Sequence, residues 1–190
     1  MQGDSFRAAR GWLRFLLVLS VSHVAMAGFV IGLLYQVGTF FAPHTDDRIA
    51  LAVVIAAALI AVVFDVRAIK TDSFAPGLHR QTSKELAHRA NIPEWVAPMM
   101  WGLDTGLMWT TFRVSATTWV LMAAALLNVA PQWSGLIFGT AFAAPLAVAV
   151  LVGRGNVSEL GRPGPRRAVQ MATVAAALLP ALLLVGGLVL

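Results

Sequence analysis

The sequence predicts an all-α integral membrane protein, a bundle of about five transmembrane helices. Of its 190 residues, 58% are hydrophobic and only 12% are charged, which is about half the charged fraction of a typical soluble domain. The hydrophobic residues gather in long runs, and a helix needs roughly 20 of them to cross the hydrocarbon of a membrane. The number of basic residues between successive runs alternates between high and low. We therefore expect one polytopic membrane domain spanning residues 1–190.

Five hydrophobic segments account for this prediction. They cover residues 13–34 (with an extension toward 41), 49–66, a span within 95–130, 134–152 and 168–190. The basic residues Arg7, Arg10 and Arg14 lie at the start of the first segment, and only Arg48 follows it. The second segment is followed by Arg67, Lys70, Arg80, Lys84 and Arg89. The third is followed by none, and the fourth by Arg154, Arg162, Arg166 and Arg167. Because cytoplasmic loops carry the excess of Lys and Arg, we expect the N-terminus in the cytoplasm and the C-terminus outside.

The third segment is too long for one straight span. Residues 95–130 would form a helix of roughly 54 Å at 1.5 Å per residue, against about 30 Å of hydrocarbon. Either an interfacial helix leads into a span, or the helix is broken or re-entrant near the polar residues 110–115. In the preceding loop, Thr82 or Ser83 is a suitable helix cap and Pro93 a stop, so we expect a short helix on the cytoplasmic membrane surface.

A short pattern occurs twice in the chain. "GFVIGLLY" begins at Gly28 and "GLDTGLMW" begins at Gly102. This indicates a two-helix repeat over residues 13–67 and 95–154 followed by a C-terminal helix, residues 168–190, although small residues also recur by chance in apolar helices. Glycines four residues apart let helices approach closely. We expect close helix packing at Gly28, Gly32, Gly102, Gly106, Gly135 and Gly139.

Polar residues inside apolar segments are the candidates for function. They are Asp104, Thr110, Thr111 and Arg113 in the third segment and His23 in the first. Asp104 and Arg113 are nine residues apart and would lie on opposite faces of an unbroken helix, so a direct pair needs a break or a contact between subunits. Asp65, near the end of the second segment, reads as an interfacial residue. A simple structural role, or a place at the membrane surface, is the alternative for each of these residues.

The composition excludes several classes of chemistry. The chain has no cysteine, which removes disulfides, thiolate catalysis and Fe–S clusters. There is no nucleotide-binding loop, no metalloprotease helix and no Ser/His/Asp order, so we expect no enzyme, no cofactor and no nucleic-acid partner. A soft metal held by His23 and Met26, which share a helix face, is a minor alternative to no metal at all.

The stretch "GLDTGLMWTTFRVSATTW" resembles the DsbD/CcdA-type transmembrane electron carriers. Gly102, Leu103, Gly106, Leu107, Trp109 and Thr110 match the glycine-rich helix motif of that family. The family motif continues with a proline and a cysteine, where this chain has Thr111 and Phe112. The resemblance implies a broken helix but, without cysteines, no thiol redox activity. The chain also looks like short multi-pass proteins of high-GC bacteria.

These observations support three hypotheses of function. The first is a non-enzymatic protein of the bacterial inner membrane with a transporter-like core for a small solute or ion. The second is an accessory or scaffold subunit of a larger membrane complex, with the lipid bilayer and either copies of itself or other subunits as partners. The third is a cysteine-less relative of a thiol-redox or metal-handling membrane protein.

Overall fold

The computed structural model describes residues 2–76, 93–109, 115–152, 167, 170–172, 174 and 175. The elements are α1 (Gln2–Thr39), the short 3-10 helix η1 (Ala42–His44), α2 (Asp47–Lys70), α3 (Val96–Gly106), α4 (Thr117–Leu126) and α5 (Ser134–Val152). Over these described ranges the regular structure is helical, which confirms the all-α class. Most of the segment 168–190 and the expected surface helix in the 67–93 loop lie outside the described residues.

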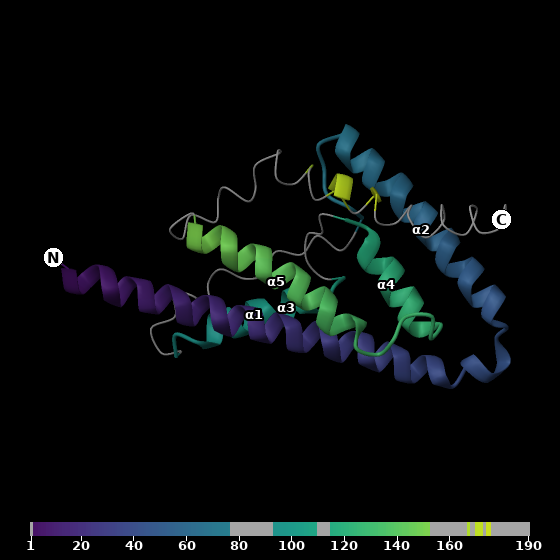
Figure 1. The fold of residues 1–190 in the computed structure, drawn as a ribbon, viewed down its shortest axis with the longest axis horizontal. Helices are drawn as coiled ribbons and strands as arrows, with labels where there is room; N and C mark the ends of the chain where they lie inside the picture. Colours follow the sequence, from purple (N-terminus) through teal and green to yellow (C-terminus); the bar gives the residue numbers. More distant parts are fainter. Residues whose placement is uncertain are drawn as a thin grey trace, which may run out of the picture.

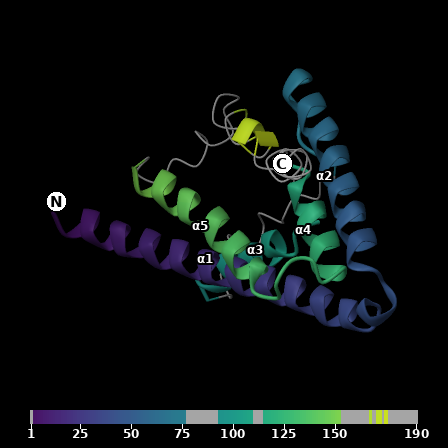
Figure 2. The same ribbon diagram turned by 45° about the vertical axis from the view of Figure 1, so that its right-hand side comes forward.

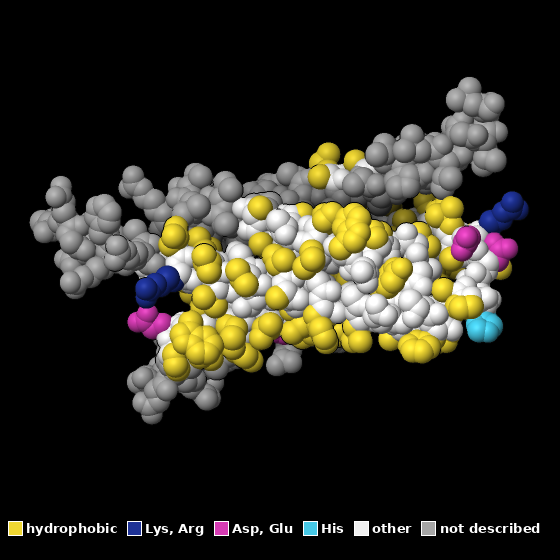
Figure 3. Space-filling view, turned by 60° about the horizontal axis from the view of Figure 1, so that its bottom comes forward, with side chains coloured by type: hydrophobic (Ala, Val, Ile, Leu, Met, Phe, Trp, Pro, Cys, Tyr) yellow, Lys and Arg dark blue, Asp and Glu magenta, His cyan; other side chains and the backbone are white. Residues whose placement is uncertain are grey.

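Two helices are long and apolar enough to cross a membrane, namely α1 from Leu13 to Thr39 and α2 over its full length. In their most apolar windows only 28% and 17% of the residues are buried inside the protein. A core helix of a soluble protein would be mostly buried, so this exposure fits a lipid-facing surface. On the face drawn in Figure 3, hydrophobic side chains cover the length of the molecule and charged ones gather toward its two ends.

The α3 helix packs along α1 in the same direction. A Cβ atom added at Gly102 would lie against the carbonyl oxygen of Leu19, and one added at Gly106 would lie 2.6 Å from the Cβ of Met26. Residue numbers therefore rise together along the contact, which defines parallel helices. Glycine at these two positions lets the backbones approach within a distance that any side chain would prevent.

The α5 helix packs along α1 in the opposite direction (Figures 1 and 2). A Cβ atom at Gly135 would lie 2.6 Å from the Cβ of Ile31, and one at Gly139 would lie 2.8 Å from the Cα of Val24. Residue numbers now run in opposite senses along the contact. Gly135 and Gly139 thus perform on α5 the packing role that Gly102 and Gly106 perform on α3.

The α4 helix links α1 to α2. At its C-terminal end, Asn128 Nδ2 donates a hydrogen bond to the Tyr35 carbonyl oxygen near the end of α1, at 2.9 Å. At its N-terminal end, the backbone N–H of Ala116 donates to Asp65 near the end of α2, at 2.7 Å. So α4 runs parallel to α1 and antiparallel to α2, and the two views show α2 and α4 side by side while α1 and α2 diverge from their connecting turn (Figures 1 and 2).

The third hydrophobic segment forms two helices instead of one. Leu107 caps α3, and Met108 follows with a left-handed backbone, φ 71°, a position where helix ends usually place glycine. Met108 is nonetheless fully buried, in a core cluster with Ala27, Val30, Ile31 and Ala125. The predicted break therefore lies between Gly106 and Thr117, beside the middle of the apolar part of α1, and residues 110–114 within it lie outside the described part of the chain.

The two copies of the glycine pattern have different surroundings. Gly102 and Gly106 face the α1 backbone near Leu19 and Met26, whereas an added Cβ at Gly28 would meet only the Leu136 side chain. At Gly32, no described atom would lie within 4 Å of an added Cβ. The glycine pairs of α1 and α3 thus do not pack against each other, and the two-helix repeat remains a hypothesis.

Candidate functional site

The structure describes two of the five polar residues expected to form a site. His23 lies in α1 and Asp104 lies in α3, whereas Thr110, Thr111 and Arg113 are outside the described residues. Asp104 is partly exposed on the side of α3 away from the buried Gly102 and Gly106. The structure brings His23 next to Thr105, the neighbour of Asp104 in sequence.

His23 lies at a junction of three helices. Its side chain, on α1, is fully buried. Its Nδ1 atom is 3.0 Å from Thr105 Oγ1 on α3, and its ring stacks on Phe142 of α5 with centroids 4.4 Å apart and planes 21° apart. A polar ring at this depth is stabilised by the hydrogen bond, because a buried polar group without one costs free energy.

Met26, the second residue of the soft-metal alternative, has a packing role in the structure. Met26 packs against the core cluster around Ala27 and Met108. Its Cβ and Cγ atoms lie against Gly106, so this side chain fills space at the contact between α1 and α3. Among the described residues, no group of three or more His, Cys, Asp or Glu side chains is placed to hold a metal ion.

Asp65 forms a second buried polar cluster, between α2 and α4. It is 1% exposed. Oδ2 accepts a hydrogen bond from Ser115 Oγ at 2.5 Å, and Oδ1 accepts one from the Ala116 backbone N–H at 2.7 Å. Ser115 Oγ lies 2.7 Å from Thr117 Oγ1 and accepts from the Thr117 N–H at 3.1 Å. The Asp65 carboxylate, which belongs to α2, thus caps the first turn of α4.

This arrangement is favourable for a charged carboxylate. The first backbone N–H groups of a helix lack partners inside it and carry a partial positive charge. The capping residue of α4 is Ala116, whose side chain provides no hydrogen-bond acceptor. Asp65 supplies that acceptor from another helix, so its charge and the helix end stabilise each other away from water. The sequence predicts Asp65 near the membrane interface, and the structure adds that its side chain is buried against the beginning of α4.

The residues that sequence reasoning missed carried usable local signals. Thr105 stands between Gly102 and Gly106, on a face that the close approach of α1 was bound to bury. Ser115 and Thr117 come directly before an apolar helical run, which is the pattern of a helix start. Their partners, His23 and Asp65, are 82 and 50 positions away, and a sequence pattern alone does not indicate such distant contacts.

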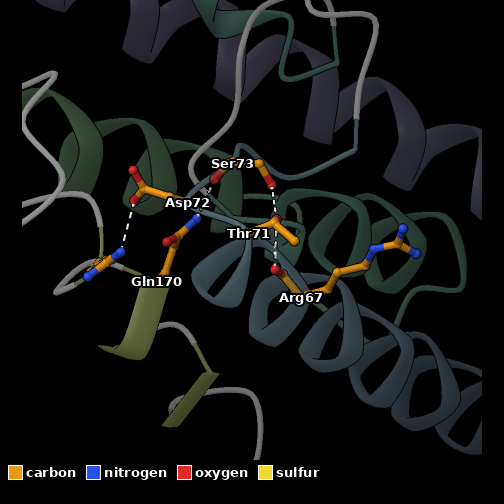
Figure 4. Close-up of polar contacts among 6 residues, drawn as sticks. Arg67, Thr71, Asp72, Ser73 and Gln170 are labelled. Carbon is orange, nitrogen blue, oxygen red and sulfur yellow. Dashed lines mark hydrogen bonds and ion pairs between the residues drawn. The ribbon is translucent and has the colours of Figure 1, made fainter.

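A third polar cluster joins the end of α2 to the beginning of the fifth segment (Figure 4). Thr71 Oγ1 donates to the Arg67 carbonyl oxygen at 2.9 Å. Arg167 pairs with Asp72 at 3.3 Å, and the buried Gln170 donates from Nε2 to the Ser73 carbonyl oxygen at 3.2 Å. Arg167 and Gln170 therefore lie at the end of α2 that carries Arg67 and Lys70.

Comparisons with known proteins assign no function to these clusters. No protein-family model, no curated protein and no solved structure matches this chain. The resemblance to the DsbD/CcdA-type carriers therefore remains a hypothesis carried by the residues around Gly102 and Gly106.

Proposed function

We propose that this chain is a multi-pass protein of the bacterial inner membrane with a transporter-like core for a small solute or ion. The lipid-exposed surfaces of α1 and α2 support a membrane location. The alternating directions of α1, α2, the α3–α4 pair and α5 support four successive crossings, with residues 168–190 as the fifth. The basic cluster at the end of α2 supports a cytoplasmic N-terminus and an external C-terminus.

One observation carries the proposal, namely the division of the third segment into α3 and α4. Each is about half the length needed to cross the hydrocarbon, at roughly 15 Å for ten residues. Irregular backbone at membrane depth is stable only when protein shields it or when it lines a wet cavity. Transporters place their binding sites at such breaks, where helix ends face the substrate.

The proposed site lies around this break. Asp104, Thr110, Thr111 and Arg113 belong to the segment that contains it, and His23 faces the same segment from α1. Asp65 joins them as a buried carboxylate at the beginning of α4. Ionisable residues within membrane spans commonly mark the paths of ions and substrates.

A reconstitution experiment tests the proposal. The purified chain is placed in liposomes, and fluxes of H⁺, Na⁺ and K⁺ are recorded under imposed ion gradients and membrane potentials. We expect a flux above that of empty liposomes, reduced about tenfold or more by Asp104→Asn or Arg113→Gln. Asp47→Asn, at the exposed start of α2, is the matched control and should retain the flux. Absence of flux for all three ions, or full flux in both site variants, would argue against a transporter-like core.

The same preparation distinguishes the other two hypotheses. A second protein that co-purifies in stoichiometric amount in mild detergent would assign the chain as an accessory subunit. Bound copper or haem, detected by elemental analysis or by the visible spectrum, would assign it to redox or metal handling. A transporter-like core requires neither.

A further inference from the structure

The hydrogen bonds of Thr105 determine which nitrogen of His23 carries the proton. A threonine hydroxyl has one hydrogen to donate. Thr105 Oγ1 lies 2.8 Å from the Trp101 carbonyl oxygen and 3.1 Å from that of Gly102, so its hydrogen is directed to the α3 backbone. In the 3.0 Å contact with His23 Nδ1, the imidazole must therefore be the donor. A neutral His23 then carries its hydrogen on Nδ1, and Nε2 is the basic nitrogen.

Two contacts of the ring would persist after protonation. Adding a proton to Nε2 leaves the Nδ1–H bond to Thr105 intact. The face of Phe142, stacked at 4.4 Å, attracts a cation through the negative charge density of its ring. The site can thus change its protonation state without losing its hydrogen bond or its ring contact, which a proton-binding group requires.

Few ionisable groups surround His23 in the described part of the chain. On α1, the residues within one turn on either side of His23 are all uncharged. The described side chains of α5 and the whole of α4 contain no ionisable residue. The α3 helix contains one, Asp104, directly before Thr105. Its side chain lies on the side of α3 away from the glycines that pack on α1.

We propose that His23 is a proton-binding site inside the helix bundle, which takes up H⁺ on Nε2, and that H⁺ is the coupling ion of the transport. The first part stands on the geometry at His23, whereas the second rests on the proposed function. An N–H bond forms on Nε2 when the ring takes up H⁺ and breaks when it releases H⁺, and no other covalent bond changes.

NMR spectroscopy of the full chain tests the proton site directly. Replacing His44, His79 and His88 by glutamine leaves His23 as the only one of the four histidines. With ¹⁵N-labelled imidazole in lipid nanodiscs, we expect a neutral ring protonated on Nδ1 at high pH. It should convert reversibly to imidazolium between about pH 9 and pH 5. A ring protonated on Nε2 at high pH, or a spectrum unchanged over this range, would overturn the proposal.

Thr105→Val supplies the matched variant, because valine has the shape of threonine without the acceptor oxygen. We expect the neutral ring to lose its preference for Nδ1–H and to shift toward Nε2–H. If the Nδ1–H form persists in this variant, Thr105 does not set the tautomer and the inference from its hydroxyl fails.

Flux measurements separate the two parts of the proposal. If His23 titrates but liposomes show no ion flux, the proton site stands and the transporter-like function falls. If flux occurs while His23 does not titrate, the proton site falls and the function stands. Coupling to H⁺ predicts that a pH gradient drives flux and that His23→Gln, once its folding has been verified by circular dichroism, abolishes this dependence. Undiminished pH-driven flux in His23→Gln would overturn the coupling.

Discussion

Ser115 Oγ donates a 2.5 Å hydrogen bond to Asp65 Oδ2, which joins the beginning of α4 to the end of α2. Among the described helices, α2 makes its main packing contact with α4. Beside it lies a small apolar cluster of Ala61, Ala75 and Ala116, against which Val120 packs. The bonds of the carboxylate add a polar connection to this apolar packing.

Removal of the Asp65 carboxylate should destabilise the protein measurably. Asp65→Ala leaves the buried Ala116 N–H without its acceptor, which costs about 1–3 kcal/mol, whereas the Ser115 hydroxyl can still bond to Thr117 Oγ1. Asp65→Asn should cost less, because an amide accepts from Ala116 and donates to Ser115. The free energy of unfolding in mixed detergent micelles measures both effects.

The matched control for this prediction is Asp47→Ala. Asp47 is an exposed acidic residue in the first turn of α2, where a carboxylate contributes about 0.3–1 kcal/mol through the helix dipole. If Asp65→Ala is no more destabilising than Asp47→Ala, the bonds to Ser115 and Ala116 contribute little, and α2 is positioned by its apolar contacts alone.

Replacing two glycines of the repeated pattern by alanine, one at a time, should change the stability of the protein in opposite directions. At Gly102 the new Cβ would overlap the Leu19 carbonyl oxygen, which is backbone and cannot turn aside. We expect Gly102→Ala to cost about 1–3 kcal/mol, as overpacked sites do. At Gly32 the added methyl group meets no described atom within 4 Å, and alanine is the better helix former by about 1 kcal/mol. Thermal unfolding of the two variants side by side checks this contrast. An equal loss of stability in both would mean that α3 and α1 adjust their spacing easily.

The helices themselves could be predicted because their signals are local. The fourth segment, residues 134–152, coincides with α5, since a serine start and an unbroken apolar run define it. That the third segment is not one straight span followed from its length, whereas the choice between a surface helix leading into a span and a re-entrant break stays open. The contacts between helices could not be predicted in the same way. Gly28 and Gly102 share a sequence pattern, but which surface each one meets depends on α5 and α3 reaching α1 from different sides.

Asn128 should be replaceable by glycine at lower cost than by alanine. Its backbone is left-handed, φ 56°, a conformation that asparagine and glycine adopt more readily than other residues. Its side chain also donates to the Tyr35 carbonyl oxygen. Asn128→Gly removes the side-chain hydrogen bonds to the carbonyl oxygens of Tyr35 and Ala125, worth about 1 kcal/mol each. Asn128→Ala removes the same bonds and adds backbone strain of about 1–2 kcal/mol. Unfolding free energies of the two variants check the order. A more stable alanine variant would show that the left-handed turn after α4 is not required.

The absence of cysteine makes the orientation of α2 directly testable. His44, in η1, and Lys70, at the end of α2, are both exposed and lie at opposite ends of that helix. If α2 crosses the membrane toward a cytoplasmic basic loop, a membrane-impermeant maleimide applied to intact spheroplasts should label the His44→Cys variant. The Lys70→Cys variant should be labelled only after the membrane is opened.

Leu59→Cys, in the apolar middle of α2, is the control and should resist labelling in both conditions because lipid surrounds it. Labelling of both end variants in intact spheroplasts would mean that α2 does not cross the membrane. The reverse order would mean that the basic cluster around Arg67 and Arg167 faces outward.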